Sequence, residues 1–213
     1  YTTDGSAPDT SSFQAESEKY FTIDTSTVIR ARAFKKDFLP GATMTHSFII
    51  GENTRLPVFS LAGNPKDFFD EDSGLFSPNT VYHELRIPVS FEYWDRIDKV
   101  SYANDATVVL QGTSASTQPP QSMRFLSNSK YGESSFNVSF FGKSSLSTFN
   151  KFVLRNSGQY KTQSYIRDGL FHSFTKDIEN IDALEYRPAI VYINGKFWSL
   201  MNLRARFDDD YIA

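Results

Sequence analysis

The stretch PAIVYINGKFWSLMNL, residues 188–203, contains two apolar runs separated by Asn194-Gly195. Asn-Gly between such runs is the strongest short-range signal for a two-residue β-hairpin turn, because both residues accept positive φ angles. Residues 188–193 and 196–203 are therefore predicted to be neighbouring antiparallel strands. This hairpin makes a sheet the expected structure for the residues around it.

Further short apolar runs lie upstream of the hairpin. Runs of four to eight apolar or alternating residues bounded by turn residues are typical of strands. The last such run, residues 151–155, stands directly before the turn Asn156-Ser157-Gly158. The predicted strands cover residues 56–62, 87–94, 106–111, 122–127, 135–141 and 151–155, and residues 65–69 are predicted to form one helical turn.

Residues 162–178 are the best candidate for a long helix. Ile166, Leu170, Phe174 and Ile178 recur every four residues, which places them on one face, and Phe171 widens the apolar stripe. We expect this stripe to pack on the sheet and to form part of the core.

Residues 1–50 have a different pattern. Asp4 to Asp9 carry turn chemistry, and residues 27–35 and 43–50 read as two strands. In the first strand, alternation places Ile29, Ala31 and Ala33 on one face and the two arginines on the other. With a boundary near Gly51–Asn53, the prediction is a domain at 1–52 and a second at 53–213. The expected fold is α+β: a partial immunoglobulin-like β-sandwich followed by a mostly antiparallel sheet with one long helix.

The composition limits the possible functions. Aromatic residues make up 15% of the 213 residues, which favours pleated, β-rich structure. The net charge of -3 argues against a dedicated nucleic-acid binder, because nothing would attract phosphate backbones over a distance. No apolar run approaches the about 20 residues that a membrane helix needs. The chain has no cysteine, which excludes disulfides and thiolate chemistry.

The sequence contains no recognisable metal or catalytic motif. Its three histidines are far apart, and the acidic clusters at 70–72 and 208–210 lack the alternating ligands and glycine of a calcium loop. Neither a GxxxxGK[ST] phosphate loop nor a GxSxG nucleophile elbow is present. We therefore predict no metal site and no catalytic residue within these 213 residues.

Two groups of motifs resemble known families. The stretches YTTDGSAPDTSS and TVIRARAFKKDFLPGATMTHSFI, within residues 1–50, resemble the chitobiase/β-hexosaminidase C-terminal β-domain, an accessory immunoglobulin-like module without catalysis. Residues 56–212 resemble the first part of the CotH kinase-like family. The motifs follow that family's order: LPVFSLAGNPKDFFDEDSGLF, RIPVSFEYWD, SMRFLSNSKYGESSFN, FVLRNSG, YIRDGL and YRPAIVYINGKFWSLMNLRARFDDDYI.

The second resemblance implies an atypical protein-kinase fold that binds ATP with a divalent metal, and some of its members phosphorylate coat proteins. By this analogy the sheet is a kinase-like N-terminal lobe and residues 162–178 are its regulatory helix. The implied nucleotide-binding residues are Gln121, Arg124, Met201 and Leu203. The acids that hold Mg²⁺ are expected beyond Ala213. The chain is thus expected to be an inactive piece of a longer protein, with ATP and Mg²⁺ as cofactors of the full-length protein alone.

Several positions depart from the family pattern. Ala115 and Gln121 replace cations that would offset phosphate charge, while Ala205 and Ser199 replace a usual Glu and Gly. A degenerate, pseudokinase-like member is one interpretation. The other is tolerated variation, in which Lys130 or Lys143 supplies the missing charge.

Functions of other classes stay open. The chain is expected to come from a secreted or cell-surface bacterial protein, whose partner would be a protein substrate, a surface component or a carbohydrate. The alternative to the kinase-like hypothesis is a non-enzymatic carbohydrate-associated adhesion module, since aromatic rings can stack on sugars. A purely structural spacer is a third possibility.

Overall fold

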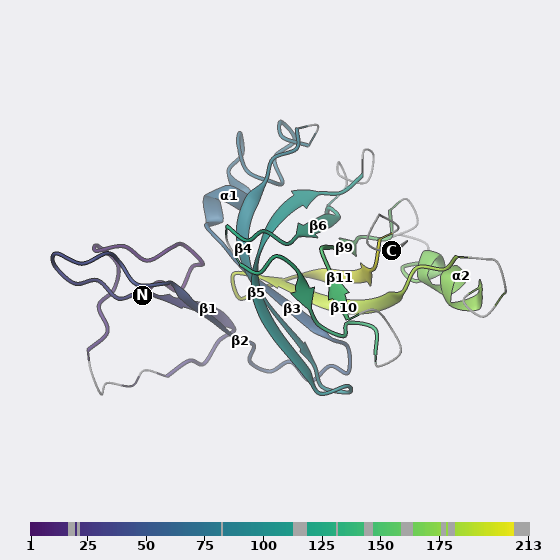
Figure 1. The fold of residues 1–213 in the computed structure, drawn as a ribbon, viewed down its shortest axis with the longest axis horizontal. Helices are drawn as coiled ribbons and strands as arrows, with labels where there is room; N and C mark the ends of the chain where they lie inside the picture. Colours follow the sequence, from purple (N-terminus) through teal and green to yellow (C-terminus); the bar gives the residue numbers. More distant parts are fainter. Residues whose placement is uncertain are drawn as a thin grey trace.

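The computed structural model describes residues 1–16, 20, 22–81, 83–112, 119–130, 132–142, 147–158, 164–175, 178 and 182–206. In this part of the chain the structure is mostly β, with eleven strands and two short helices (Figure 1). No helix among the described residues is long and apolar enough to cross a membrane.

The mostly antiparallel sheet that the sequence predicted is a closed barrel of seven strands. Neighbouring strands are antiparallel except β3 and β10, whose parallel pairing between Val58–Leu61 and Ile190–Ile193 closes the barrel. In order around the barrel the strands are β10 (Tyr186–Ile193), β11 (Lys196–Arg204), β9 (Lys151–Arg155), β6 (Met123–Leu126), β5 (Val100–Leu110), β4 (Ile87–Asp95) and β3 (Val58–Ala62).

The predicted strands of this region are confirmed, with changes in length. The hairpin between β10 and β11 turns at Asn194 and Gly195, whose φ angles are 50° and 77°. The strand predicted over residues 135–141 is shorter, being β7 (Phe136–Asn137), which pairs with β8 (Thr148–Phe149). The helical turn predicted after β3 is α1 (Pro65–Phe69), where the Asn64 side chain accepts a hydrogen bond from the Lys66 backbone N–H.

Phenylalanine rings fill the barrel. Phe125 and Phe152 stack with their centroids 4.6 Å apart, and Phe152 also contacts four further aromatic rings. Burying such side chains stabilises the fold by roughly 1.5–3 kcal/mol each. The interior is a packed core, so a ligand has to bind on the outside of the barrel or at its ends.

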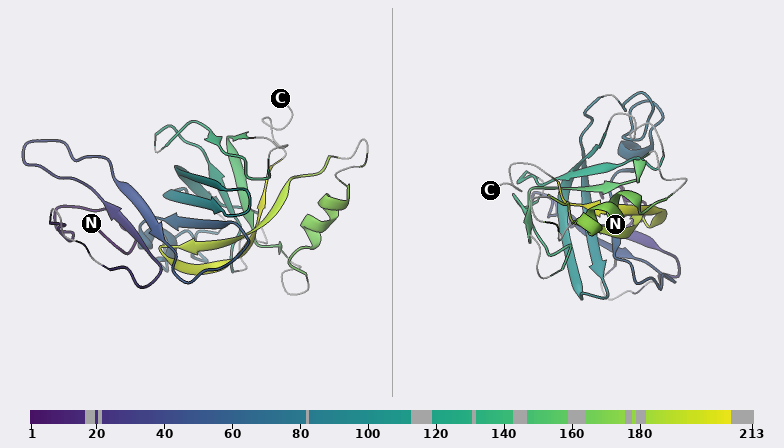
Figure 2. Two further views of the ribbon diagram at one scale, coloured as in Figure 1. Left: turned by 90° about the horizontal axis from the view of Figure 1, so that it is seen from below. Right: turned by 90° about the vertical axis from the view of Figure 1, so that its right-hand side faces the viewer.

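The N-terminal residues form a two-stranded sheet of β1 (Thr27–Ala31) and β2 (Met44–Phe48), joined by a bridge from Thr2 to Arg30. It projects from one end of the barrel (Figure 2). The alternation predicted in β1 is present only in part: Val28 is buried, Ile29 and Arg30 are half-buried, and Ala31 and Ala33 are exposed. Arg30 lines a groove together with barrel residues such as Ser90 and Asp105, and its Nη1 donates to the carbonyl of Gly5 in the N-terminal segment.

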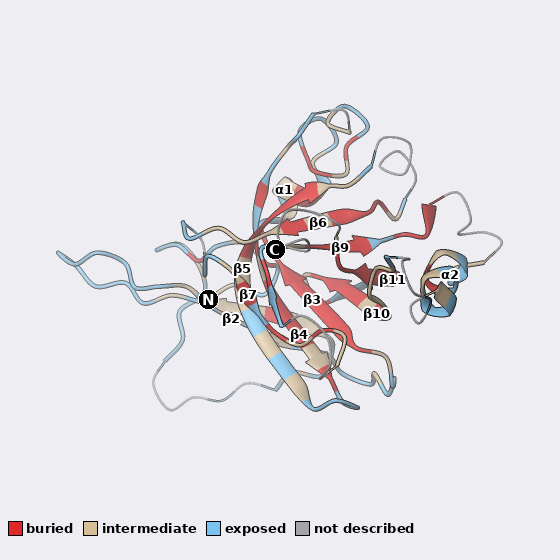
Figure 3. Cartoon of the chain, turned by 45° about the vertical axis from the view of Figure 1, so that its right-hand side comes forward, coloured by how far each residue is buried: buried red, intermediate tan, exposed pale blue. Residues whose placement is uncertain are grey.

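The long helix predicted over 162–178 is not confirmed at that length: the structure has the shorter helix α2 (Arg167–Thr175). Residues 159–163, 176–177 and 179–181 lie outside the described part of the chain. The predicted packing of the helix is wrong. The side chains of the apolar stripe are 41% to 69% exposed, and those that belong to α2 face solvent at the end of the barrel away from the two-stranded N-terminal sheet, which we call the N-terminal hairpin (Figure 3). The exposed residues are Ile166, Leu170, Phe171, Phe174 and Ile178.

A polar face of α2 docks instead. Gly169 lies so close to the ring of Tyr186 that an added Cβ would come within 2.3 Å of it. Asp168 forms ion pairs with strand arginines, and His172 accepts a hydrogen bond from the Leu184 backbone N–H at 3.0 Å. Ion pairing and the close approach at glycine thus orient α2, rather than burial of its leucine and phenylalanine.

Candidate functional site

The end of β9 is built around a buried polar turn. Ser122 Oγ donates to Asn156 Oδ1 at 2.9 Å, and the Asn156 backbone N–H donates back to Ser122 Oγ at 3.0 Å. The Gly158 N–H also donates to Asn156 Oδ1, at 2.9 Å. Buried polar groups are stable only when they are hydrogen-bonded, so this network fixes the start of the chain segment that leads to α2.

Ser157 stores backbone strain in this turn. Its φ of 66° lies in the left-handed region, which residues other than glycine rarely adopt, and Gly158 follows at 58°. The Ser157 hydroxyl donates to the carbonyl of Tyr165, and Asn202 Nδ2 donates to Ser157 Oγ and, at 3.1 Å, to the same carbonyl. Strained residues held in this way gather at functional sites.

Beside the turn, Asp168 of α2 joins two arginines from neighbouring strands. The nearer Asp168 oxygen lies 2.7 Å from Arg204 Nη1 and 3.2 Å from Arg155 Nε. Arg204 is only 4% exposed, and its Nε has no hydrogen-bond partner among the described residues. Burial lowers the pKa of the Arg204 guanidinium, and the Asp168 carboxylate partly opposes that shift.

A second arginine group surrounds Glu84. Its carboxylate lies 3.3 Å from Arg86 Nη2 and 3.7 Å from Arg124 Nη2. Burial lowers the pKa of Arg124, and the like charges of Arg206 and Arg86 lower it further. Arg124 Nε is also buried without a hydrogen-bond partner in the described part of the chain.

Strand register connects the two groups. Val153 of β9 lies opposite Arg124 of β6 on one side and opposite Arg204 of β11 on the other. Phe152 and Leu154, on either side of Val153 in β9, point into the core. Val153 and its two cross-strand partners, Arg124 and Arg204, therefore point to the outside of the barrel. Five arginines are therefore gathered near two carboxylates on this outer surface, which we call the arginine face: Arg86, Arg124, Arg155, Arg204 and Arg206, with Glu84 and Asp168.

The arginine face is suited to binding an anion. Guanidinium groups match phosphate and carboxylate oxygens through paired N–H donors, and here one buried Nε on each of Arg124 and Arg204 lacks a partner among the described residues. A chain with a net charge of -3 gains no such positive surface from composition alone. Elsewhere, no three His, Asp or Glu side chains of the described residues gather as metal ligands.

The structure separates the residues that the sequence analysis assigned to a nucleotide. Arg124 is part of the arginine face. Gln121, two residues before the strand that carries Arg124, is 5% exposed, and its Oε1 has no hydrogen-bond partner in the described part of the chain. Met201 and Leu203 point into the barrel core and are fully buried, so their contact with adenine stays a prediction.

Sequence reasoning assigned no role to Arg155 or Asp168, and it named Asn202 and Arg204 only as part of the adenine hinge that the family resemblance implies at residues 201–204. Alternation in β11 was the available signal, because if Met201 and Leu203 face the core, then Asn202 and Arg204 must face outward.

The structure places neither of the two lysines suggested as substitutes for the missing cations at the arginine face: Lys130 lies in another groove, and Lys143 is outside the described residues. Lys130 lines a groove between the N-terminal hairpin and the barrel, together with Arg30 and Asp105. Lys143 and Ala115 lie outside the described residues. The structure therefore does not place Lys130 among the residues of the arginine face, and the lysine hypothesis stays a prediction.

Comparison with known families confirms both resemblances. Residues 108–213 match the family model described as CotH kinase protein, and residues 1–45 match the model described as chitobiase/beta-hexosaminidase C-terminal domain. No curated protein matches the chain. All residues of the arginine face except Glu84 and Arg86 fall within the first match.

Proposed function

We propose that residues 53–213 form the nucleotide-facing lobe of a CotH-like atypical protein kinase, in a secreted or cell-surface bacterial protein. The arginine face is the observation that carries this proposal, because it offers guanidinium donors to an anion beside a strained polar turn. The match of residues 108–213 to the CotH kinase model supports the same assignment.

The contact between α2 and the strands suits a kinase-like lobe. Phosphoryl transfer depends on positioning and on neutralising phosphate charge, and in protein kinases an acid on a helix holds a strand cation in place. Asp168 holds Arg155 and Arg204 in a comparable way. In this proposal α2 is the regulatory helix, and a second lobe supplies the acids for Mg²⁺ and covers the exposed apolar stripe.

We further propose that the lobe is degenerate. Gln121 is neutral where the family resemblance expects a cation, and it is buried two residues before the start of β6, the strand that carries Arg124. This chain alone should bind Mg-ATP no more tightly than the millimolar range and should transfer no phosphate. Residues 1–52 are proposed to be part of an immunoglobulin-like sandwich that acts as an accessory module.

Isothermal titration with Mg-ATP tests these statements. We expect weak binding that weakens further with salt and that Arg124→Ala reduces at least threefold. The matched control is Arg55→Ala, which removes an exposed arginine outside the arginine face and should change nothing. Gln121→Lys should tighten binding about tenfold by restoring the missing cation.

The outcomes separate the parts of the proposal. Micromolar binding by the unmodified chain would contradict degeneracy. An affinity for Mg-ATP that is unchanged in Arg124→Ala would contradict the assignment of the arginine face as the nucleotide site. If no nucleotide binds to the chain or to its Gln121→Lys variant, the non-enzymatic adhesion or spacer role becomes the better account.

A further inference from the structure

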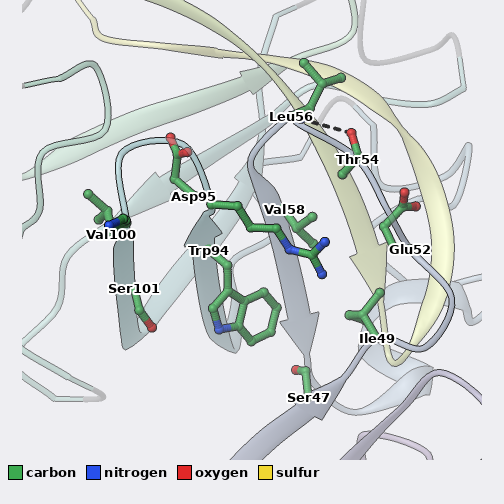
Figure 4. Close-up of a pocket in the computed structure, with 12 residues that line it drawn as sticks. Ser47, Ile49, Glu52, Thr54, Leu56, Val58, Trp94, Asp95, Val100 and Ser101 are labelled. Atoms are coloured by element: carbon green, nitrogen blue, oxygen red, sulfur yellow. Dashed lines mark hydrogen bonds between the residues drawn. The ribbon is translucent and has the colours of Figure 1, made fainter.

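A separate pocket of about 440 Å³ is lined by residues between Ser47 and Ser101, all of which precede the segment that matches the CotH model. One wall is the segment from Ser47 to Val58, which leads from the N-terminal hairpin into the barrel. The other wall is the turn between β4 and β5, from Trp94 to Ser101. Its volume is in the range of small-molecule sites, and Figure 4 shows the lining side chains around Trp94 and Val58.

Trp94 gives this pocket an aromatic surface. On β4 the neighbouring Tyr93 points into the core, so Trp94 points outward, opposite Val58 of β3 and Ser101 of β5. It is half-buried, which fixes the indole while leaving part of it accessible. A fixed, partly exposed indole combines an apolar face with a polar N–H, as a binding surface requires.

The pocket has an excess of unpaired positive charge. Asp95 is fully buried and already paired with Arg187, and the backbone N–H of Ile97 donates to it at 2.8 Å. Arg96 and Lys99 are exposed, and no carboxylate of the described residues lies within ion-pair distance of either. Lys99 also has a φ of 54°, in the left-handed region that residues other than glycine rarely adopt.

Oxygen atoms complete the lining. Glu52 accepts a hydrogen bond from the Tyr192 hydroxyl at 2.8 Å, which holds the carboxylate in place while leaving it further acceptor capacity. Ser47 Oγ is buried without a partner among the described residues. Thr54 Oγ1 accepts from the Leu56 N–H at 2.9 Å and keeps its own hydrogen to donate.

We propose that this pocket binds an acidic saccharide, with Trp94 against the sugar ring, Arg96 and Lys99 on its carboxylate, and Glu52 with Ser47 and Thr54 on its hydroxyls. The mixture of groups favours this class of ligand. Two cations select an anionic substituent, whereas a carboxylate among hydroxyls suits a ligand that carries many O–H donors.

Titration with trigalacturonate tests the proposal, by calorimetry and by tryptophan fluorescence. The chain has two tryptophans, so Trp198→Phe leaves Trp94 as the only reporter. We expect a fluorescence change on binding, a loss of affinity of at least tenfold in Trp94→Ala, and a smaller loss in Trp94→Phe. The pair Arg96→Gln and Lys99→Gln should weaken binding at least fivefold and reduce its dependence on salt.

Controls make the result specific to this pocket. Lys196→Gln removes an exposed lysine outside the pocket and should bind trigalacturonate as the unmodified chain does. Circular dichroism and a melting curve verify that each variant is folded. Equal binding of the uncharged trigalactose, displacement of the sugar by ATP, unchanged binding in the Arg96 and Lys99 variants, or no binding at millimolar trigalacturonate would each overturn the proposal.

Discussion

His172 shows how a single residue links α2 to the barrel. Its Nδ1 accepts the Leu184 backbone N–H, so the ring must be unprotonated at that nitrogen. Burial lowers the pKa of His172 below its ordinary value of 6.5, and the nearby positive charges of Arg204 and Arg155 lower it further, against the opposing effect of Asp168. The unfolded chain therefore takes up a proton at this residue more readily than the folded chain does.

This difference predicts that the stability of the folded chain decreases as the pH decreases. Above the unfolded pKa both states are neutral at His172, and its contribution to stability is complete. As the pH falls below about 6.5, the unfolded state gains protons first and becomes relatively more stable. We expect the urea midpoint to decrease between pH 7.5 and 5.5, and His172→Gln to remove part of that decrease.

The matched control is His83→Gln, which changes an exposed histidine and should leave the pH dependence as it is. Identical pH profiles for the unmodified chain and His172→Gln would show that the hydrogen bond to Leu184 does not couple α2 to proton uptake.

At the scale of elements, α2 shows that an apolar stripe does not by itself choose a packing face. The stripe was predicted to be core, yet the face with Asp168, Gly169 and His172 contacts the barrel. The two strand arginines and the ring of Tyr186 decide the orientation, because a buried Arg204 without Asp168 would be an unpaired charge. The stripe is then free to contact another body, which we propose to be a second lobe.

Two substitutions distinguish these faces. Gly169→Ala should destabilise the chain by about 1–2 kcal/mol, because the clash with Tyr186 outweighs the gain in helix propensity. Phe174→Ala, at a side chain that is 69% exposed, should stay within about 0.5 kcal/mol of the unmodified chain. Urea denaturation measures both. A larger loss for Phe174→Ala than for Gly169→Ala would reverse the orientation described for α2.

At the scale of the whole molecule, the N-terminal residues pack closely against the barrel at the Asn194-Gly195 turn. An added Cβ on Gly195 would lie 2.4 Å from the Cα of Thr27, and one on Gly5 would lie 2.1 Å from Asn194 Oδ1. The Asn194 side chain also binds the Gly63 backbone: its Oδ1 accepts from the Gly63 N–H at 3.0 Å, and its Nδ2 donates to the Gly63 carbonyl at 2.9 Å. The turn that defines the barrel hairpin is thus also the point where the two predicted units meet.

Gly195→Ala should therefore loosen the junction. Alanine adds strain at a φ of 77° and a clash with the backbone of Thr27. Limited proteolysis with mass spectrometry should show faster cleavage between residues 50 and 56, the predicted boundary, than in the unmodified chain. Gly142→Ala is the control, since it adds strain at a φ of 100° but meets no atom within 4 Å. Equal cleavage rates in the two variants would argue that the junction does not protect the boundary.

The sequence by itself determined the local features of this protein. Asn194-Gly195 predicted its hairpin, apolar runs predicted the strands of the barrel, and two sets of motifs predicted both family matches. These features depend on residues that are close in the chain, where φ preferences and side-chain periodicity act directly.

Only the tertiary structure decided the closure of the barrel by β3 and β10, the docking face of α2 and the gathering of the arginines. Each depends on partners distant in the chain, such as Asp168 and Arg204 or Val58 and Ile190. A periodic pattern shows which residues share a face, but not what that face meets. Charged groups and strand edges find their partners only when the barrel forms. A charged or polar group that is then buried without a partner has a high cost in free energy.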